Sequence, residues 1–329
     1  MIVLIPEGNP KGLAIPYISG RLGPVSPTTA PPTGTVFPDD FCLPGKFEDC
    51  GEHLRDAGDF SPSPQNTSIF DEGPVFVGRE NPAFSRSELR FWANGQSRQT
   101  EMSAASESIN TTSTSIGGDR RFGSTFILGA MALRENTTTT FALPGSTETA
   151  TGTKYGPYFA LRLSDTWVLD GRYLVGRSSH QVNTGGFATG QFNSQGGFGA
   201  LRVSAALDRG NWRIHPSLEL SQEFQNSDAY TDTFAGAVAA SSESNGFITG
   251  AVLAYYSGLG AGNGNLLPYA GLELSQSLDG GGTPFGAVRA GMAITMGNGA
   301  VLNFDYAYGA IGLANINDQL LSIRLEIPF

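Results

Sequence analysis

The amino-acid sequence predicts an all-β fold, a twelve-stranded antiparallel transmembrane β-barrel behind a Pro-rich and mostly irregular N-terminal segment. The 329 residues include 44 glycines and only 15% charged residues, a composition that favours strands and turns over helices. Hydrophobic and polar residues alternate from residue 86 onward, as they do in strands with one apolar face. No apolar run approaches the roughly 20 residues of a spanning helix, so a helical membrane protein is excluded.

Residues 1–85 form the first of two predicted units. They hold 13 of the 19 prolines, and neither helical nor strand periodicity persists in them, which predicts an extended linker or weakly ordered coil. Cys42 and Cys50 close a small loop if they are oxidised, and two unrelated thiols are the alternative. The first residues, Met1–Glu7, lack the basic start of a signal peptide. We therefore expect a fragment, a processed form or a wrongly assigned start.

The second unit, residues 86–329, contains the predicted strands. Each strand approaches the roughly 9–11 residues that a tilted strand needs to cross a bilayer. The twelve strands are expected at 86–98, 109–119, 124–134, 153–163, 166–177, 197–207, 211–224, 246–257, 266–277, 285–296, 299–308 and 319–329.

The connections between these strands alternate in length. Outer-membrane barrels have short turns at the periplasmic end and longer loops at the extracellular end. The short connections are expected at 120–123, 164–165, 208–210, 258–265 and 297–298. The long polar connections are expected at 99–108, 135–152, 178–196, 225–245, 278–284 and 309–318.

The last strand separates an apolar face from a polar one most clearly. Leu321, Ile323, Leu325, Ile327 and Phe329 share the face predicted to meet lipid. Charges elsewhere also fall on the polar face, as a wet lumen requires and a dry core would forbid. We expect these charged residues to face the lumen, where they form structural ion pairs or contact an inserted segment. They are Arg90, Arg162, Asp170, Arg172, Arg202, Glu219, Glu273, Arg289, Asp305, Arg324 and Glu326.

Several stretches resemble the translocator β-domain of type V autotransporters. No single stretch is specific, but their order over residues 86–329, combined with twelve strands, is fairly specific. The stretches are Gly117–Phe122 leading into Phe126–Ala130, Tyr155–Tyr158, Trp167–Gly171, Trp212–Glu219, Leu267–Leu272 and the ending Ile327–Phe329.

The resemblance implies a monomeric barrel in the outer membrane of a Gram-negative bacterium, surrounded by outer-membrane lipid. It implies assembly by the barrel-assembly machinery, which in such proteins recognises the final strand, here with Leu325, Ile327 and Phe329 as the signal. It also implies protein secretion: the barrel anchors an N-terminal passenger and exports it through or alongside its pore. Residues 1–85 would then be a linker or passenger remnant that partly threads the pore.

Other functions stay open at this stage. One is an independent outer-membrane porin with an N-terminal extension, and others are a soluble β-sandwich or adhesin and a membrane-embedded hydrolase. The hydrolase would use His180, which follows Ser178 and Ser179, but a catalytic His must reach a Ser and be oriented by a third polar group. We predict no enzyme, hence no catalytic, cofactor-binding or metal residues. The net charge of −10 argues against nucleic-acid binding.

Overall fold

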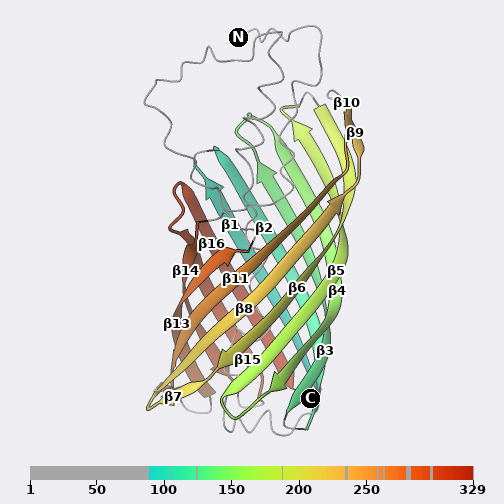
Figure 1. The fold of residues 1–329 in the computed structure, drawn as a ribbon. Coiled ribbons are helices and arrows are strands. Elements are labelled where there is room, and N and C mark those ends of the chain that lie inside the picture. Colours follow the sequence, from blue (N-terminus) through green and yellow to red (C-terminus); the bar gives the residue numbers. More distant parts are fainter. Residues whose placement is uncertain are drawn as a thin grey trace.

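The computed structural model describes residues 89–328, except 104, 124, 187, 234–235, 258, 262–263, 279–282 and 297–298 (Figure 1). The predicted N-terminal unit 1–85, with Cys42 and Cys50, lies outside the described residues, and so does Phe329. In the part that is described, no helix is long and apolar enough to cross a membrane.

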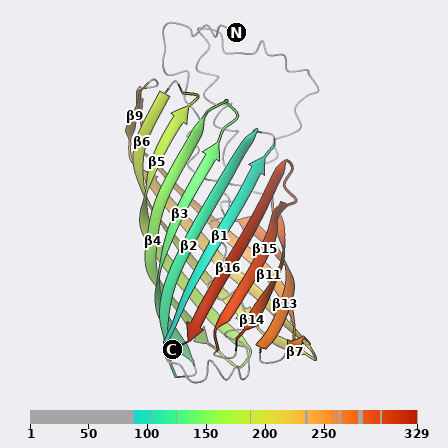
Figure 2. The ribbon, with the colours of Figure 1, turned by 180° about the vertical axis from the view of Figure 1, so that it is seen from behind.

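Twelve long antiparallel strands close into a barrel, which confirms the predicted fold. Consecutive long strands pair along the chain, and the pairing of β1 with β16 closes the ring (Figure 2). The long strands are β1 Leu89–Met102, β2 Glu107–Phe122, β3 Phe126–Thr140, β4 Thr147–Arg162, β5 Trp167–Thr184, β6 Ala188–Ala205, β8 Trp212–Ser227, β11 Ser241–Tyr256, β13 Gly264–Ser277, β14 Phe285–Thr295, β15 Val301–Ile311 and β16 Ile316–Pro328.

Four short strands lie at the two ends of the barrel. At the end where β1 begins, β7 (Leu207–Arg209) pairs with β8, and β12 (Gly260–Ala261) pairs with β13. At the opposite end, β9 (Tyr230–Asp232) and β10 (Gly236–Val238) form a two-stranded arm between β8 and β11 (Figure 1). Because an antiparallel barrel has no free edge, every long strand finds a partner on both sides.

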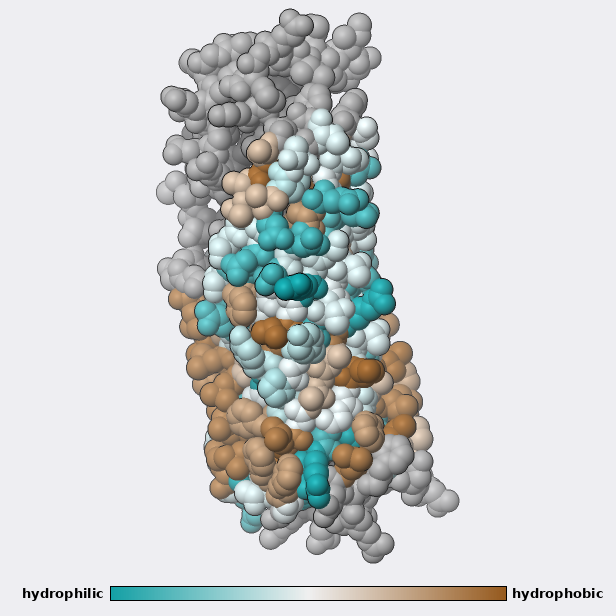
Figure 3. All heavy atoms as spheres, turned by 90° about the vertical axis from the view of Figure 1, so that its right-hand side faces the viewer, coloured by the Kyte–Doolittle hydropathy of each residue, from teal (hydrophilic) through white to brown (hydrophobic). Residues whose placement is uncertain are grey.

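Apolar side chains form a belt on the outer surface near the end where β1 begins. Leu128, Tyr155, Leu218, Leu272 and Ile323 are among the large hydrophobic residues that are 46–65% exposed. The face drawn in Figure 3 has hydrophobic side chains toward this end and polar ones toward the other. Such a surface suits a lipid bilayer around the belt and water above it.

The prediction of long loops at 135–152 and 178–196 is wrong, because most of these residues belong to strands. β3 continues to Thr140, β4 starts at Thr147, and β5 and β6 leave only residues 185–187 between them. These extensions lie beyond the apolar belt, where Thr and other polar residues point outward as well as inward. The hydropathy alternation therefore disappears, while the backbone pairing of β-branched residues continues.

β3 and β11, which carry apolar residues on both faces over 126–133 and 247–256, supply part of the interior packing. Ile127 of β3 packs inside the barrel with Ala160 and Val168. Leu253 of β11 packs inside with Tyr255 and Tyr269. The apolar belt thus has small apolar clusters behind it, set among a mostly polar interior.

Candidate functional site in the barrel interior

Nine of the eleven charged residues predicted to face the lumen are buried within the strand wall, at 1–8% exposure. Arg162 and Glu273 are half-buried, and each shares its strand face with inward residues such as Tyr158 on β4 and Ser275 on β13. These groups do not form one site. Nine of the eleven fall into three clusters around the barrel wall, and the two outside these clusters are Arg162 and Glu219, the register partner of Arg202.

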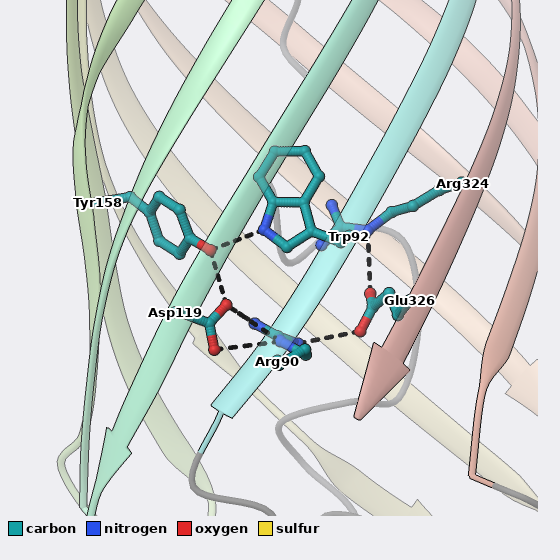
Figure 4. Close-up of polar contacts among 6 residues, drawn as sticks. All are labelled: Arg90, Trp92, Asp119, Tyr158, Arg324 and Glu326. Atoms are coloured by element: carbon teal, nitrogen blue, oxygen red, sulfur yellow. Dashed lines mark hydrogen bonds and ion pairs between the residues drawn. The ribbon is translucent and has the colours of Figure 1, made fainter. Parts of the chain in front are cut away.

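The first cluster, the seam cluster, joins the first and last strands (Figure 4). Arg90 on β1 donates to both carboxylate oxygens of Asp119 on β2, the shortest distance being 2.7 Å, and to Oε2 of Glu326 on β16 at 3.0 Å. Glu326 also lies 2.9 Å from Nε of Arg324, whose guanidinium sits 4.6 Å from the centre of the Trp92 ring.

A tyrosine extends the seam cluster to β4. The Tyr158 hydroxyl accepts a hydrogen bond from Trp92 Nε1 at 2.6 Å and donates one to Asp119 Oδ2 at 2.6 Å. Buried hydrogen bonds and ion pairs therefore link four strands, β1, β2, β4 and β16. Buried ion pairs of this kind add little net stability, because desolvation offsets most of the attraction. Removing one partner is nevertheless costly, because it leaves the other charge buried and unpaired.

The second cluster lies on β13, β14 and β15. Arg289 stands between Glu273, at 3.3 Å, and Asp305, at 3.5 Å. Tyr269 donates to Asp305 Oδ1 at 2.8 Å, and its ring lies 4.9 Å from the ring of Tyr255. The arrangement repeats that of the seam cluster: an arginine between two carboxylates, one of which also accepts from a tyrosine.

The third cluster lies on β5 and β6. Arg202 pairs with Asp170 at 3.1 Å, and Arg172 sits 4.9 Å from the centre of the Phe198 ring. A separate pair reaches further: Lys154 on β4 lies 3.2 Å from Glu223 on β8, although β5 and β6 stand between those strands. This pair bridges part of the barrel interior.

Inward-facing aromatic rings lie over glycines of the neighbouring strand. A Cβ at Gly129 would collide with the Tyr158 ring, one at Gly117 with the Trp92 ring, and one at Gly291 with the Tyr269 ring. The glycines thus make room for the aromatic members of the first two clusters.

Sequence reasoning missed the partners Asp119, Tyr158, Trp92 and Tyr269 as site residues. Only the alternation of inward positions could have selected them, because their contacts depend on the register between strands. Leu325 and Ile327, predicted as part of the assembly signal, lie on the outer face at 36% and 37% exposure. Within the described ranges, no group of three or more His, Cys, Asp or Glu side chains is arranged to hold a metal ion.

A closed barrel with an apolar belt and a charged interior defines an outer-membrane β-barrel protein. Residues 89–311 match the family described as autotransporter beta-domain, and the chain belongs to this family. It is an outer-membrane translocator of a passenger domain from a Gram-negative bacterium. No curated protein matches the chain.

Solved translocator structures share the fold. The beta domain of the Bordetella autotransporter BrkA is 21% identical with a TM-score of 0.65, and the match covers 74% of this chain and 100% of that one. The translocator domain of NalP from Neisseria meningitidis is 15% identical with a TM-score of 0.62, covering 74% and 89%. The transport unit of AIDA-I from Escherichia coli is 14% identical with a TM-score of 0.58, covering 74% and 90%.

Proposed function

We propose that the barrel interior is the route by which the segment before Leu89 reaches the cell surface, and that this segment then stays in the pore as an anchor. In this proposal residues 1–85 are the linker or passenger remnant and residues 86–329 the barrel. The paired charges of the three clusters line the route and contact the segment.

One observation carries the proposal: β1 begins at the end of the barrel next to the apolar belt, whereas β3 to β6 extend beyond the belt at the opposite end. Leu89 pairs with Arg120, near the end of β2, and Arg90 pairs with Pro328, the last residue of β16. In outer-membrane barrels this end faces the periplasm. A passenger that is connected to Leu89 and displayed outside must therefore cross the membrane beside β1, and the charged interior offers a polar path.

We further propose a monomer embedded in outer-membrane lipid and assembled by the barrel-assembly machinery. Each long strand is hydrogen-bonded to a strand of the same chain on both sides, which supports a barrel formed by a single chain. The outward face of β16, with Leu321, Ile323, Leu325 and Ile327, supports recognition of the last strand.

An export assay on intact cells tests the route. The full chain, carrying a cleavable export signal and an epitope after Gly45, is expressed in a Gram-negative host. Ser275 is buried on the inner face of β13, whereas the next residue, Gln276, is exposed on the outer face. Ser275→Trp should reduce antibody access to the epitope, and Gln276→Trp should leave it at the wild-type level.

Heat-modifiable migration shows that both variant barrels have folded. Equal surface display from two folded variants would contradict a route through the interior. A second candidate function is a solute channel, favoured by a cavity between β1, β2 and β13–β16 whose lining includes Gln96, Arg98, Glu273, Arg289 and Asp318. A channel would conduct ions whether or not residues 1–85 are present.

A further inference from the structure

Three polar side chains form a hydrogen-bonded chain near the extracellular end of the barrel. His180 on β5 stands between Glu148 on β4 and Ser194 on β6. Its Nδ1 lies 2.8 Å from Glu148 Oε1, and its Nε2 lies 2.8 Å from Ser194 Oγ. All three residues are at most 4% exposed. The serine is not Ser178 or Ser179, which precede His180 in the sequence, but one on the following strand.

The paired strands β4, β5 and β6 hold these three side chains in place. His180 is in register with Ala150 and Phe192, so Glu148 and Ser194 are its diagonal neighbours on the two adjacent strands. The imidazole also stacks on the Phe192 ring, with ring centres 4.3 Å apart and planes inclined by 12°. Side chains fixed on paired strands keep their geometry better than side chains on loops.

The three hydrogen-bonded side chains lie outside the membrane. The outward-pointing residues at the same height are Thr149, Gln181 and Asn193, all exposed and all polar. They belong to the strand extensions beyond the apolar belt. The Glu148, His180 and Ser194 side chains point the other way, toward the inside of the barrel mouth.

We propose that Ser194 is the nucleophile of an acyl-transfer site, with His180 as its general base and Glu148 as the positioning residue for the imidazole. A serine, a histidine and a carboxylate in hydrogen-bonded sequence are recognised by geometry and not by order in the chain. The proposal adds an activity to the translocator function and departs from the sequence prediction of no enzyme.

The reaction follows from the geometry. Ser194 Oγ attacks the carbonyl carbon of an ester while its proton passes to His180 Nε2. The leaving alcohol takes that proton as the ester bond breaks, and the acyl group remains on Ser194 as a new ester. A water molecule, deprotonated by His180, then releases the carboxylic acid and restores Ser194. Glu148 stabilises the imidazolium that forms in each half of the reaction.

Donors for the developing oxyanion come from β8. Ser227 is the register partner of Ser194, and Gln225 donates to Ser227 Oγ through Nε2 at 3.4 Å. A side-chain amide and a hydroxyl beside the nucleophile are groups that stabilise such a charge.

The β9–β10 arm packs against β6 beside the site. Tyr230 of this arm covers the Phe192 ring, with ring centres 4.9 Å apart. Thr233 of the same arm accepts from Thr189 N at 2.9 Å and donates through its own N to Thr189 O at 3.1 Å. Because Phe192 offers an aromatic platform once Tyr230 leaves, the substrate class is an aryl ester of a small carboxylic acid.

A fluorophosphonate probe tests the nucleophile in the full chain folded in detergent micelles. An activated serine displaces fluoride and forms an O–P bond, and peptide mass spectrometry locates the adduct. We expect an adduct on Ser194 that forms faster in Tyr230→Ala, in which the cover is removed. Ser194→Ala should abolish the adduct, whereas Ser221→Ala, at a buried serine further down the wall, should leave it unchanged.

Two further variants separate activation from a structural role. His180→Phe keeps a ring for stacking on Phe192 but removes the base, so the labelling rate should fall by about 10²-fold or more. Glu148→Gln keeps a hydrogen bond but loses the charge that stabilises the imidazolium, so labelling should also slow. Hydrolysis of p-nitrophenyl acetate should follow the same ranking.

Heat-modifiable migration confirms that each variant is folded. A folded Tyr230→Ala barrel that carries no adduct on Ser194 would overturn the proposal. A labelling rate that is the same with and without His180 would also overturn it, because the three side chains would then form only a structural hydrogen-bond network.

Discussion

Arg90 and Glu326 form an ion pair of 3.0 Å across the junction where the first and last strands meet. Both side chains are nearly fully buried, and Arg90 also binds Asp119 on the next strand. The closure of the barrel is thus marked by charges inside the wall as well as by backbone hydrogen bonds. Since residues 236 positions apart supply the pair, it forms only when the ring is complete.

Removing Arg90 should destabilise the barrel strongly. Arg90→Met leaves the Asp119 and Glu326 carboxylates buried without their shared cation, and the free energy of unfolding should fall by about 3–5 kcal/mol. Urea titration of the protein in lipid vesicles measures the change. The matched control is Arg213→Met, which breaks an exposed pair with Asp208 and should cost no more than about 1 kcal/mol. Equal effects of the two substitutions would contradict a structural role for the seam cluster.

A methyl group at Gly129 should also destabilise the barrel. It would collide with the Tyr158 ring, which joins Trp92 to Asp119, and overpacking of this kind costs about 1–3 kcal/mol. Gly95→Ala is the matched control, because a Cβ there meets nothing within 4 Å. The same urea titration separates the two, and a Gly129→Ala barrel as stable as Gly95→Ala would show that the Tyr158 ring can move away freely.

The extracellular mouth should lose stability as the pH rises. Burial, and then the charge of Glu148, raise the pKa of Glu107 to about 7 from its ordinary 4.5. Because this acid holds its proton more tightly when folded, its contribution is complete below about pH 4.5 and is lost as the pH rises through about 7. Glu107→Gln should therefore flatten the fall in thermal midpoint between pH 5 and 8.

The exposed Glu101 supplies the control for that measurement. Glu101→Gln should leave the pH dependence of the thermal midpoint as it is in the wild type. If Glu107→Gln behaves like Glu101→Gln, the carboxyl of Glu107 does not sense its burial.

Assembly should depend on the last residue. Phe329→Asp replaces the aromatic residue of the predicted assembly signal with a charge, and the amount of heat-modifiable barrel in the outer membrane should drop several-fold. Gln191→Asp adds the same charge on the exposed outer face of β6, beyond the apolar belt, and should assemble normally. Normal assembly of Phe329→Asp would remove the proposed role of the terminal strand.

The sequence predicted the membrane-crossing parts of the fold because lipid imposes a pattern there. Leu321, Ile323 and Leu325 alternate with polar residues for that reason, and their strand lies where it was expected. The upper halves of β3 to β6 escaped prediction, because water on both sides of the wall removes the alternation. At Thr137 or Gln181 nothing in the hydropathy separates a strand from a loop.

The same limit applies to side-chain partners. Alternation placed Arg90, Asp305 and Arg324 on the polar face, but it could not pair Arg90 with Asp119 or His180 with Ser194. Those contacts depend on register across strands, and the register at Ser194 is set by the short connection between β5 and β6, which lies inside a predicted long loop.

Single-channel conductance in planar bilayers tests the central claim most directly. The full chain is compared with a chain that lacks residues 1–85, and both are checked for heat-modifiable folding. If the N-terminal segment occupies the interior, the full chain should conduct poorly and the shortened chain should give larger, steadier currents. Equal conductance of the two folded barrels would contradict an N-terminal segment threaded through the pore.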